Sequence, residues 1–246
     1  MEDGEWRDNL RGTPQGAVAS PILANIYLHY VLDLWFQKKW RTRVATGATI
    51  IVRYADDFVV GFQRKQDAER FLHDLKERLG QFELELHPDK TRLIEFGRFA
   101  MADRRARGER RPETFDFLGF THYCRKKRNG KFGLGRKPIA KRVTRTLNRI
   151  KGELRKRMHE DVHETARWLG QVVNGWLNYF AVPTSSSAAR GFVRRLSWIW
   201  VNVLRRRSQK DRTTIADIVR IAALHWPPVQ VRHPWPTVRF AVKHPR

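Results

Sequence analysis

The chain has 246 residues, enough for one large or two small hydrophobic cores. Its 49 lysines and arginines outnumber 25 aspartates and glutamates, and the formal charge of +24 indicates a polyanionic partner such as nucleic acid. The single cysteine, Cys124, excludes an intramolecular disulfide and a cysteine-based zinc cluster, and no apolar run reaches the ~18 residues of a membrane span.

The basic excess lies entirely in the second part of the chain. Residues 1–95 contain 14 basic and 15 acidic side chains, whereas residues 96–246 contain 35 and 10. This distribution predicts a near-neutral platform followed by a nucleic-acid clamp. The acidic start lacks the basic-then-apolar order of a signal peptide, so we expect a cytoplasmic protein with no membrane partner.

The first part of the chain predicts helices alternating with short strands. An amphipathic helix is expected from Ser20, as N-cap, to about residue 36, with Pro21 at its first position. Its apolar residues are Ile22, Ile26, Tyr30, Val31, Leu34 and Trp35. Two apolar runs at 49–55 and 58–62 predict a hairpin, 66–82 predicts a helix, and 83–86 and 91–96 predict short strands.

Two adjacent carboxylates, Asp56 and Asp57, occupy the apex of the predicted hairpin. Aspartate is depleted in strands, and two like charges this close repel unless protons or cations neutralise them. Magnesium prefers oxygen ligands and is often held by one or two carboxylates plus substrate phosphates. The pair therefore indicates a site where metal meets a nucleotide, with a solvated surface turn as the alternative.

The second part of the chain predicts a small sheet and then helices. Residues 98–113 are expected to be a flexible connection, 115–120 a strand, and Asn129-Gly130 the turn of a hairpin. Helices are expected from Pro138 to about 158, then near 161–181, 186–207 and 213–225. The first of these helices turns the stripe Ile139, Val143, Leu147, Ile150, Leu154 and Met158 inward, which leaves its basic residues outside.

Four of the six tryptophans in the basic region form two groups. Trp176 and Trp198 lie on apolar helix faces and are expected in the core. Trp226 and Trp235, flanked by Pro and His, are candidates for stacking on bases or for docking the tail.

Several segments together resemble a reverse transcriptase of the group II intron type, in its bacterial class C branch. They are Gly12-Thr13-Pro14-Gln15-Gly16 with Ser20–Asn25, Tyr54-Ala55-Asp56-Asp57, Lys90-Thr91, Phe117-Leu118-Gly119-Phe120, Gly175–Phe180, and His233–Pro236 with Arg239-Phe240. They occur in the order that the family shows and extend over nearly the whole chain.

The resemblance implies an α+β fold in which residues 1–135 are a partial polymerase palm with a primer-grip hairpin. Residues 136–246 would be an all-α thumb and maturase (X) domain with a Pro-rich tail. The implied activity is RNA-directed DNA synthesis together with intron splicing and mobility. The implied partners are group II intron RNA, an RNA template with a DNA primer, and dNTP.

The resemblance also implies a role for each matching residue. Asp56 and Asp57 would be catalytic and would bind Mg²⁺ in a two-metal site, with Asp56 the more direct ligand. Nucleotide and primer contacts are implied for Gly12, Pro14, Gln15, Gly16, Tyr54, Ala55, Lys90, Phe117 and Gly119. RNA contacts are expected of Arg142, Arg145, Arg149, Arg155, Arg205, Arg206 and Arg207. The last three also suit the macrodipole of a helix C-terminus.

Only eleven residues precede Gly12, whereas the family carries its fingers and a first metal-binding aspartate upstream of that block. We therefore expect the metal site to be incomplete in these 246 residues, and a separate N-terminal fragment is one way to complete it. The alternatives to a polymerase are an RNA-binding splicing cofactor and a degenerate mobile-element fragment. We expect this chain alone to bind RNA and to polymerise poorly.

Overall fold

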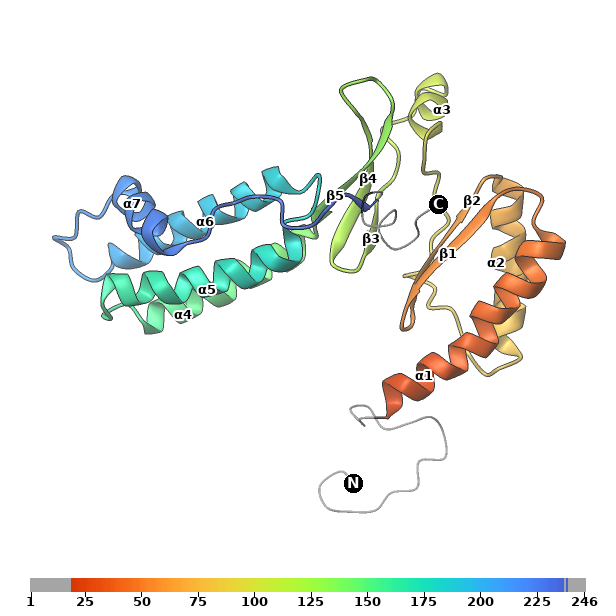
Figure 1. Cartoon of the computed structure of the whole chain (residues 1–246), viewed down its shortest axis with the longest axis horizontal. Coiled ribbons are helices and arrows are strands. Elements are labelled where there is room, and N and C mark those ends of the chain that lie inside the picture. The colour runs from red at the N-terminus through yellow and green to blue at the C-terminus, as the bar shows by residue number, and fades with distance from the viewer. Residues whose placement is uncertain (1–18, 237, 239–246) are drawn as a thin grey trace, which may run out of the picture. The chain divides into compact units, whose positions relative to one another are not determined.

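The computed structural model describes residues 19–236 and 238 and divides the chain into two compact units, Met1–Ile94 and Glu95–Arg246 (Figure 1). Helices and small antiparallel sheets occur in both units, so the mixed helix and strand class is confirmed. The three-stranded sheet belongs to the second unit, and the assignment of residues 1–135 to a palm stays a prediction.

The first unit consists of one long helix, a hairpin and a second helix. The long helix contains α1 (Ser20–Leu28) and two π-helical segments, η1 (His29–Asp33) and η2 (Phe36–Val44). The hairpin contains β1 (Thr49–Tyr54) and β2 (Asp57–Phe62). The second helix, α2, spans Lys65–Gly80. The hairpin and α2 confirm the predicted elements. The core contains Val31, Leu32, Trp35, Phe36, Trp40, Phe71, Leu75 and Leu79.

The first helix departs from its prediction at both ends. Its N-cap is Ala19 rather than Ser20, and it continues past residue 36 to Val44. In its π-helical segments, hydrogen bonds span five residues, as from the Leu34 N–H to the His29 carbonyl. Only the later turns are buried; Ile22, Ile26 and Tyr30, which belong to the apolar residues of the predicted helix, are exposed among the described residues.

The segment after α2 is irregular, so the strands predicted at 83–86 and 91–96 are wrong. Glu83 has a φ of 55°, a left-handed conformation that ends helices, and the Leu84 N–H donates back to the Leu79 carbonyl at 3.0 Å. A turn follows in which the Lys90 N–H donates to the His87 carbonyl at 3.2 Å. Leu84 and Leu86 pack on the core without pairing into a ladder.

The second unit begins with α3 (Ala100–Ala106), within the stretch predicted to be a flexible connection, so that prediction is corrected. A three-stranded antiparallel sheet follows, in the order β3-β4-β5. The strands are β3 (Phe115–Phe117), β4 (Phe120–Lys126) and β5 (Phe132–Pro138). The predicted strand 115–120 is therefore two strands joined by a turn, whereas the Asn129-Gly130 hairpin is confirmed.

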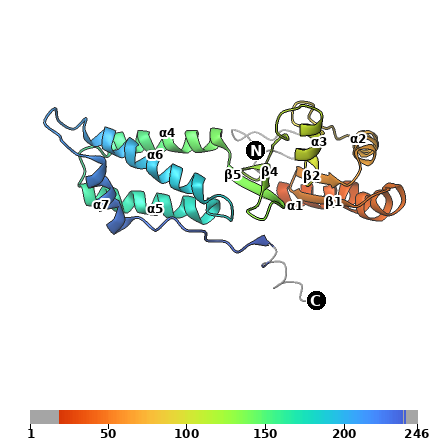
Figure 2. The same cartoon turned by 90° about the horizontal axis from the view of Figure 1, so that it is seen from above.

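Four helices complete the second unit. They are α4 (Ala140–Lys156), α5 (Val162–Phe180), α6 (Ser186–Leu204) and α7 (Ile215–His225). The first three run alongside one another, and α7 packs on α5 and α6 (Figure 2). Two of the helix starts are specified locally, since Asp161 caps α5 and a Thr214–Asp217 capping box opens α7. No helix within residues 19–236 has the length and hydropathy of a membrane span.

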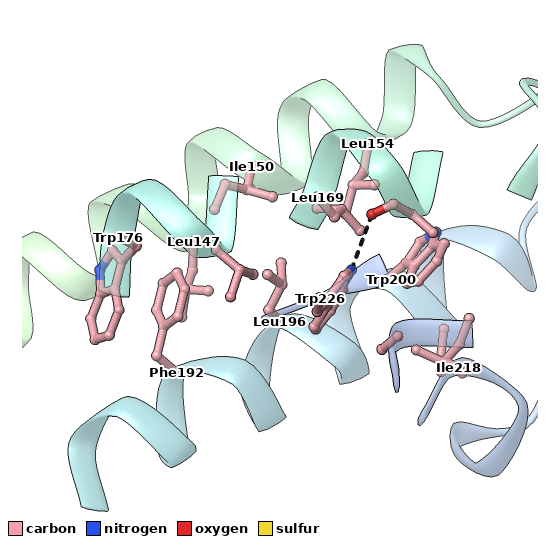
Figure 3. Close-up of a cluster of buried hydrophobic side chains, with 14 of the residues drawn as sticks. Leu147, Ile150, Leu154, Leu169, Trp176, Phe192, Leu196, Trp200, Ile218 and Trp226 are labelled. Atoms are coloured by element: carbon pink, nitrogen blue, oxygen red, sulfur yellow. Dashed lines mark hydrogen bonds between the residues drawn. The ribbon is translucent and has the colours of Figure 1, made fainter. Parts of the chain in front are cut away.

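The core of the second unit confirms the predicted stripe on α4, where Leu147, Ile150 and Leu154 are buried (Figure 3). Trp176 stacks on Phe192 with ring centroids 4.0 Å apart, as expected of a core tryptophan. Trp198 is 49% exposed, so its predicted burial is wrong. It lies two positions from the buried Leu196 and Trp200, which places it on the opposite face of α6.

Candidate functional site

The two predicted catalytic aspartates lie at a two-residue hairpin turn. Tyr54 pairs with Asp57 across the hairpin, which leaves Ala55 and Asp56 as the loop. Ala55 has a φ of 53° and Asp56 does not have a positive φ, the sign pattern of a type II′ turn. Glycine is the usual residue at that first loop position, and a left-handed conformation costs other residues roughly 1–2 kcal/mol. The turn is therefore strained.

The side chains of Asp56 and Asp57 are exposed and make no hydrogen bond or ion pair with the residues that the structure describes. Magnesium is commonly bound by one or two carboxylates together with phosphates and water, so two free carboxylates on one turn fit such an ion. Across residues 19–236 and 238, no group of three His, Cys, Asp or Glu side chains gathers as a metal site. Two carboxylates alone would provide only part of the coordination shell of such an ion.

The outer face of the hairpin carries apolar side chains up to Asp57. Ile50, Val52 and Tyr54 are all exposed, at 63, 49 and 66%, and Tyr54 lies directly across from Asp57. The inner face, with Ile51, Phe58, Val60 and Phe62, packs on the core of the first unit. Because neighbouring residues of a strand alternate between faces, one side anchors the hairpin and the other presents Asp57 and Tyr54 outward.

Arg53, which the sequence did not single out, joins this turn to the long helix. Its guanidinium donates to the Ala55 carbonyl at 2.8 Å and to both carboxylate oxygens of Asp33, at 2.9 and 2.6 Å. The hydrogen bonds from Arg53 lower the pKa of Asp33 below its ordinary value. An isolated sequence contains no signal for such a contact, because Asp33 lies 20 residues away on another element.

A second strained turn joins β3 to β4. Phe117 pairs with Phe120, and the two loop residues, Leu118 and Gly119, have φ values of 47° and 80°. Two positive φ angles are typical of a type I′ turn, for which Asn-Gly is the favoured sequence. The Tyr179 hydroxyl, at the end of α5, donates to the Leu118 carbonyl at 2.9 Å.

The family comparison bears on both turns. Residues 2–122 match the family model described as reverse transcriptase (RNA-dependent DNA polymerase). The chain carries a reverse transcriptase domain. The match includes both strained turns and ends within β4. A comparison with curated proteins finds no match.

The remaining candidates of the reverse transcriptase domain fall into three places. Gly12, Pro14, Gln15 and Gly16 lie outside the described residues. Lys90 is exposed on the turn that follows α2, in the first unit with Asp56. Phe117 and Gly119 belong to the second unit, beside the helices.

The helices that follow the reverse transcriptase domain expose a row of unpaired cations. Arg142, Arg145, Arg149 and Arg155 all project from α4, and none forms an ion pair within the described part of the chain. The Arg142 guanidinium lies beside the second turn, since a Cβ added to Gly119 would come within 3.3 Å of Nη1. The structure thus brings one predicted RNA contact and one predicted primer contact together.

In the other basic run, Arg205–Arg207, two of the three side chains form hydrogen bonds within the protein. Arg205 donates to the Thr213 carbonyl and Arg207 to the Glu160 carbonyl, each at 2.8 Å. Arg206 is exposed. These contacts favour the structural interpretation for Arg205 and Arg207.

The tail that follows α7 forms hydrogen bonds with α5. Trp226 is buried and donates to the Ala166 carbonyl at 3.2 Å, which assigns it to docking rather than to base stacking (Figure 3). Arg232 donates to the side chains of Asn174 and Asn178. Trp235 is 54% exposed and stays a candidate for stacking; Arg239 and Phe240 lie outside the described residues.

Proposed function

We propose that this protein is an RNA-directed DNA polymerase and maturase of the group II intron type. Its palm would carry Asp56 and Asp57, and its thumb and maturase region would be the helices from α4 onward. The observation that carries the proposal is a pair of free carboxylates on a strained hairpin turn inside a reverse transcriptase domain. Strained backbone clusters at functional sites, where the surrounding structure maintains it.

In this proposal Asp56 and Asp57 would hold Mg²⁺, with Asp56 the more direct ligand. The ion, when bound, supplies charge stabilisation for the attacking and leaving oxygens of nucleotidyl transfer. Tyr54 and Ala55 shape the approach to the carboxylates, because the small Ala55 side chain leaves the loop open. Gly12, Pro14, Gln15 and Gly16 would line the pocket for the incoming dNTP, since glycine allows close backbone approach.

The primer and the RNA would be bound by separate groups of residues. Phe117 and Gly119 are proposed to position the primer backbone, and Lys90 to contact a phosphate. The unpaired arginines of α4 would neutralise RNA phosphates, so binding should weaken steeply with salt. The motif Gly175–Phe180 and the docked tail support a maturase role for this part of the chain.

The second candidate is an RNA-binding splicing cofactor without polymerase activity. The observation that favours it is the basic surface of α4, which lies beyond the reverse transcriptase match and does not need the aspartates. A degenerate mobile-element fragment would lack both functions.

Primer extension on an RNA template with magnesium tests the proposal. Wild-type chain is compared with Asp56→Asn, and Asp89→Asn, an exposed aspartate on another turn of the same unit, is the control. If primer extension is lost in Asp56→Asn and retained in Asp89→Asn, the result supports the polymerase. RNA binding without any Asp56-dependent extension, even at high protein concentration, supports the cofactor instead. The same assay checks the expectation that these 246 residues extend a primer poorly by themselves.

Filter binding to structured RNA over a salt series tests the proposed RNA surface. The double variant Arg145→Gln/Arg149→Gln should weaken binding and reduce the slope of log K against log salt by roughly two. The control, Arg43→Gln/Lys65→Gln, removes the same charge from the first unit. An equal effect of both variants would indicate non-specific attraction by net charge.

A further inference from the structure

The turn that carries the aspartates needs support from outside the loop. Ala55 has a φ of 53° at a position where a type II′ turn usually has glycine. Such conformations persist where the surrounding structure over-determines them. Asp56 and Asp57 have no partners of their own among the described residues, so their side chains do not supply that support.

Arg53 is placed to supply it. It lies on the inner face of β1, and its side chain is only 13% exposed. Nη1 donates to the Ala55 carbonyl and to Asn25 Oδ1, both at 2.8 Å. Nε and Nη2 donate to the two oxygens of Asp33 in a bidentate pair. One side chain thus binds the strained residue and two positions of the long helix.

Both helix partners are themselves fixed. Asn25 Nδ2 donates to the Pro21 carbonyl at 2.9 Å, so the amide oxygen is turned toward Arg53. Asp33 closes the π-helical segment η1, between the buried Leu32 and the half-buried Leu34, and also lies 3.5 Å from His29. Through Asp33, the contact with Ala55 is therefore anchored in the packed part of the first unit, whereas Asn25 adds an exposed partner on α1.

The geometry requires arginine in particular. A planar guanidinium carries five N–H groups in a fixed fork, whereas a lysine ammonium is a single point with three donors. Four contacts to three residues use three different nitrogens of Arg53. A lysine would keep the charge beside Asp33 and lose the simultaneous hold on Ala55.

We propose that Arg53 is a positioning residue that clamps the Ala55 carbonyl to Asn25 and Asp33, and so fixes the turn on which Asp56 and Asp57 bind metal. The role in metal binding rests on the proposed function; the clamp itself does not. Arg53 has no hydrogen bond to the side chain of Asp56 or Asp57, so in this role it acts through the backbone of the turn.

Two measurements on the full chain test the clamp with Arg53→Lys, which keeps the partly buried charge of Asp33 paired. Hydrogen exchange of the amides at 54–57 should become faster, while exchange in α2 stays unchanged. Binding of Mn²⁺, the probe for the aspartates, should weaken roughly tenfold, as is typical when the support of a metal ligand is removed. Arg43→Lys, an exposed arginine of the same unit, is the control and should change neither.

Glycine at position 55 distinguishes a clamp from general stabilisation. Because glycine adopts a positive φ without support, Ala55→Gly added to Arg53→Lys should restore most of the Mn²⁺ affinity. A residue needed only for folding would lower the unfolding midpoint of the whole unit, and Ala55→Gly would not reverse the loss at the turn.

The outcomes separate the two proposals. Unchanged exchange at 54–57 in Arg53→Lys, or no recovery by Ala55→Gly, overturns the clamp while leaving the polymerase proposal intact. If Asp56→Asn changes neither Mn²⁺ binding nor primer extension, the metal site is wrong, and the exchange measurement still decides the clamp.

Discussion

The two strained turns of this protein are supported in the same way and present opposite chemistry. In each, a hydrogen bond from another residue reaches the carbonyl of a non-glycine residue with positive φ: Arg53 to Ala55, and Tyr179 to Leu118. The first turn ends in unpartnered carboxylates. The second is apolar, and Phe120 stacks on Tyr179 with ring centroids 5.6 Å apart.

In the proposed function, this difference corresponds to different roles for the two turns. The first exposes charge that only a cation neutralises, and its support comes from a charged residue with a bidentate partner. The second packs against the end of α5 and carries no charge of its own, which suits contact with a sugar or a base. Five predictions test this comparison, from the largest expected effect to the smallest.

The largest effect is expected at the carboxylates. Asp56→Asn should lower primer extension by roughly a hundredfold or more, the scale of losing one electrostatic contact to a transition state. Asp57→Asn should lower it less, because Asp56 is the proposed direct ligand. Single-turnover rates at fixed Mg²⁺ measure both. Equal losses would assign the two residues equal roles.

Gly119→Ala adds a second strained residue to the turn that already contains Leu118. With a φ of 80° and the Tyr179 ring 3.4 Å from an added Cβ, the change should cost about 2 kcal/mol of unfolding free energy. Gly130→Ala, at a φ of 73° with open space around it, is the control for the backbone part alone. Urea unfolding measures the unfolding free energy of both variants. A cost no larger than that of the control would show that the side chains of Tyr179 and Arg142 move to make room for the added Cβ.

Tyr179→Phe removes the hydroxyl that holds the second turn and keeps the ring. The loss of one hydrogen bond should cost about 1 kcal/mol and raise the KM for primer more than it lowers kcat. Tyr123→Phe removes a hydroxyl that has no partner among the described residues and should have little effect. An effect on kcat alone would argue against a role in primer positioning.

Leu118→Asn creates the Asn-Gly pair that a type I′ turn favours, so it should stabilise the second unit by roughly 0.5 kcal/mol. If Leu118 is retained for primer contact, the same variant should bind primer–template more weakly. Thermal unfolding and a binding titration measure the two effects. A stabilised variant with full binding would remove Leu118 from the proposed interface.

The smallest expected effect is the dependence of the first unit's stability on acid pH. Because hydrogen bonds from Arg53 lower the folded pKa of Asp33, its contribution to stability is complete above the unfolded value near 4 and is lost as pH falls through the lower folded value. Unfolding of the first unit should therefore become easier below about pH 4. Asp33→Asn should reduce this dependence, as measured by urea unfolding over a pH series.

Local patterns predicted much of the architecture. The hairpin and its apex follow from two β-branched runs separated by a short joint, and the α4 stripe follows from its helical period. The strands expected at 83–86 and 91–96 did not form: the left-handed Glu83 interrupts the first, and residues 91–96 follow the turn at Lys90 without pairing to a strand. Trp198 was misplaced because an apolar helix face is broader than the part that packs.

Contacts between distant segments could not be predicted in this way. In the sequence, Arg53 is one residue of a predicted strand, yet its hydrogen-bond partners Asp33 and Asn25 lie 20 and 28 residues earlier in the chain. Tyr179 and Leu118 are 61 residues apart, and Arg232 meets Asn178 across 54 residues. No periodicity records such pairs, since each depends on how two elements pack.

By itself, the sequence determined where this protein gathers charge and which short segments become helices or hairpins, because these depend on neighbours within a few residues. It also determined that two aspartates share one hairpin apex. Only the tertiary structure decided that the apex is strained, that Arg53 holds it, and that Trp226 docks the tail. Packing brings these groups together, and their hydrogen bonds then satisfy polar atoms that folding removes from water.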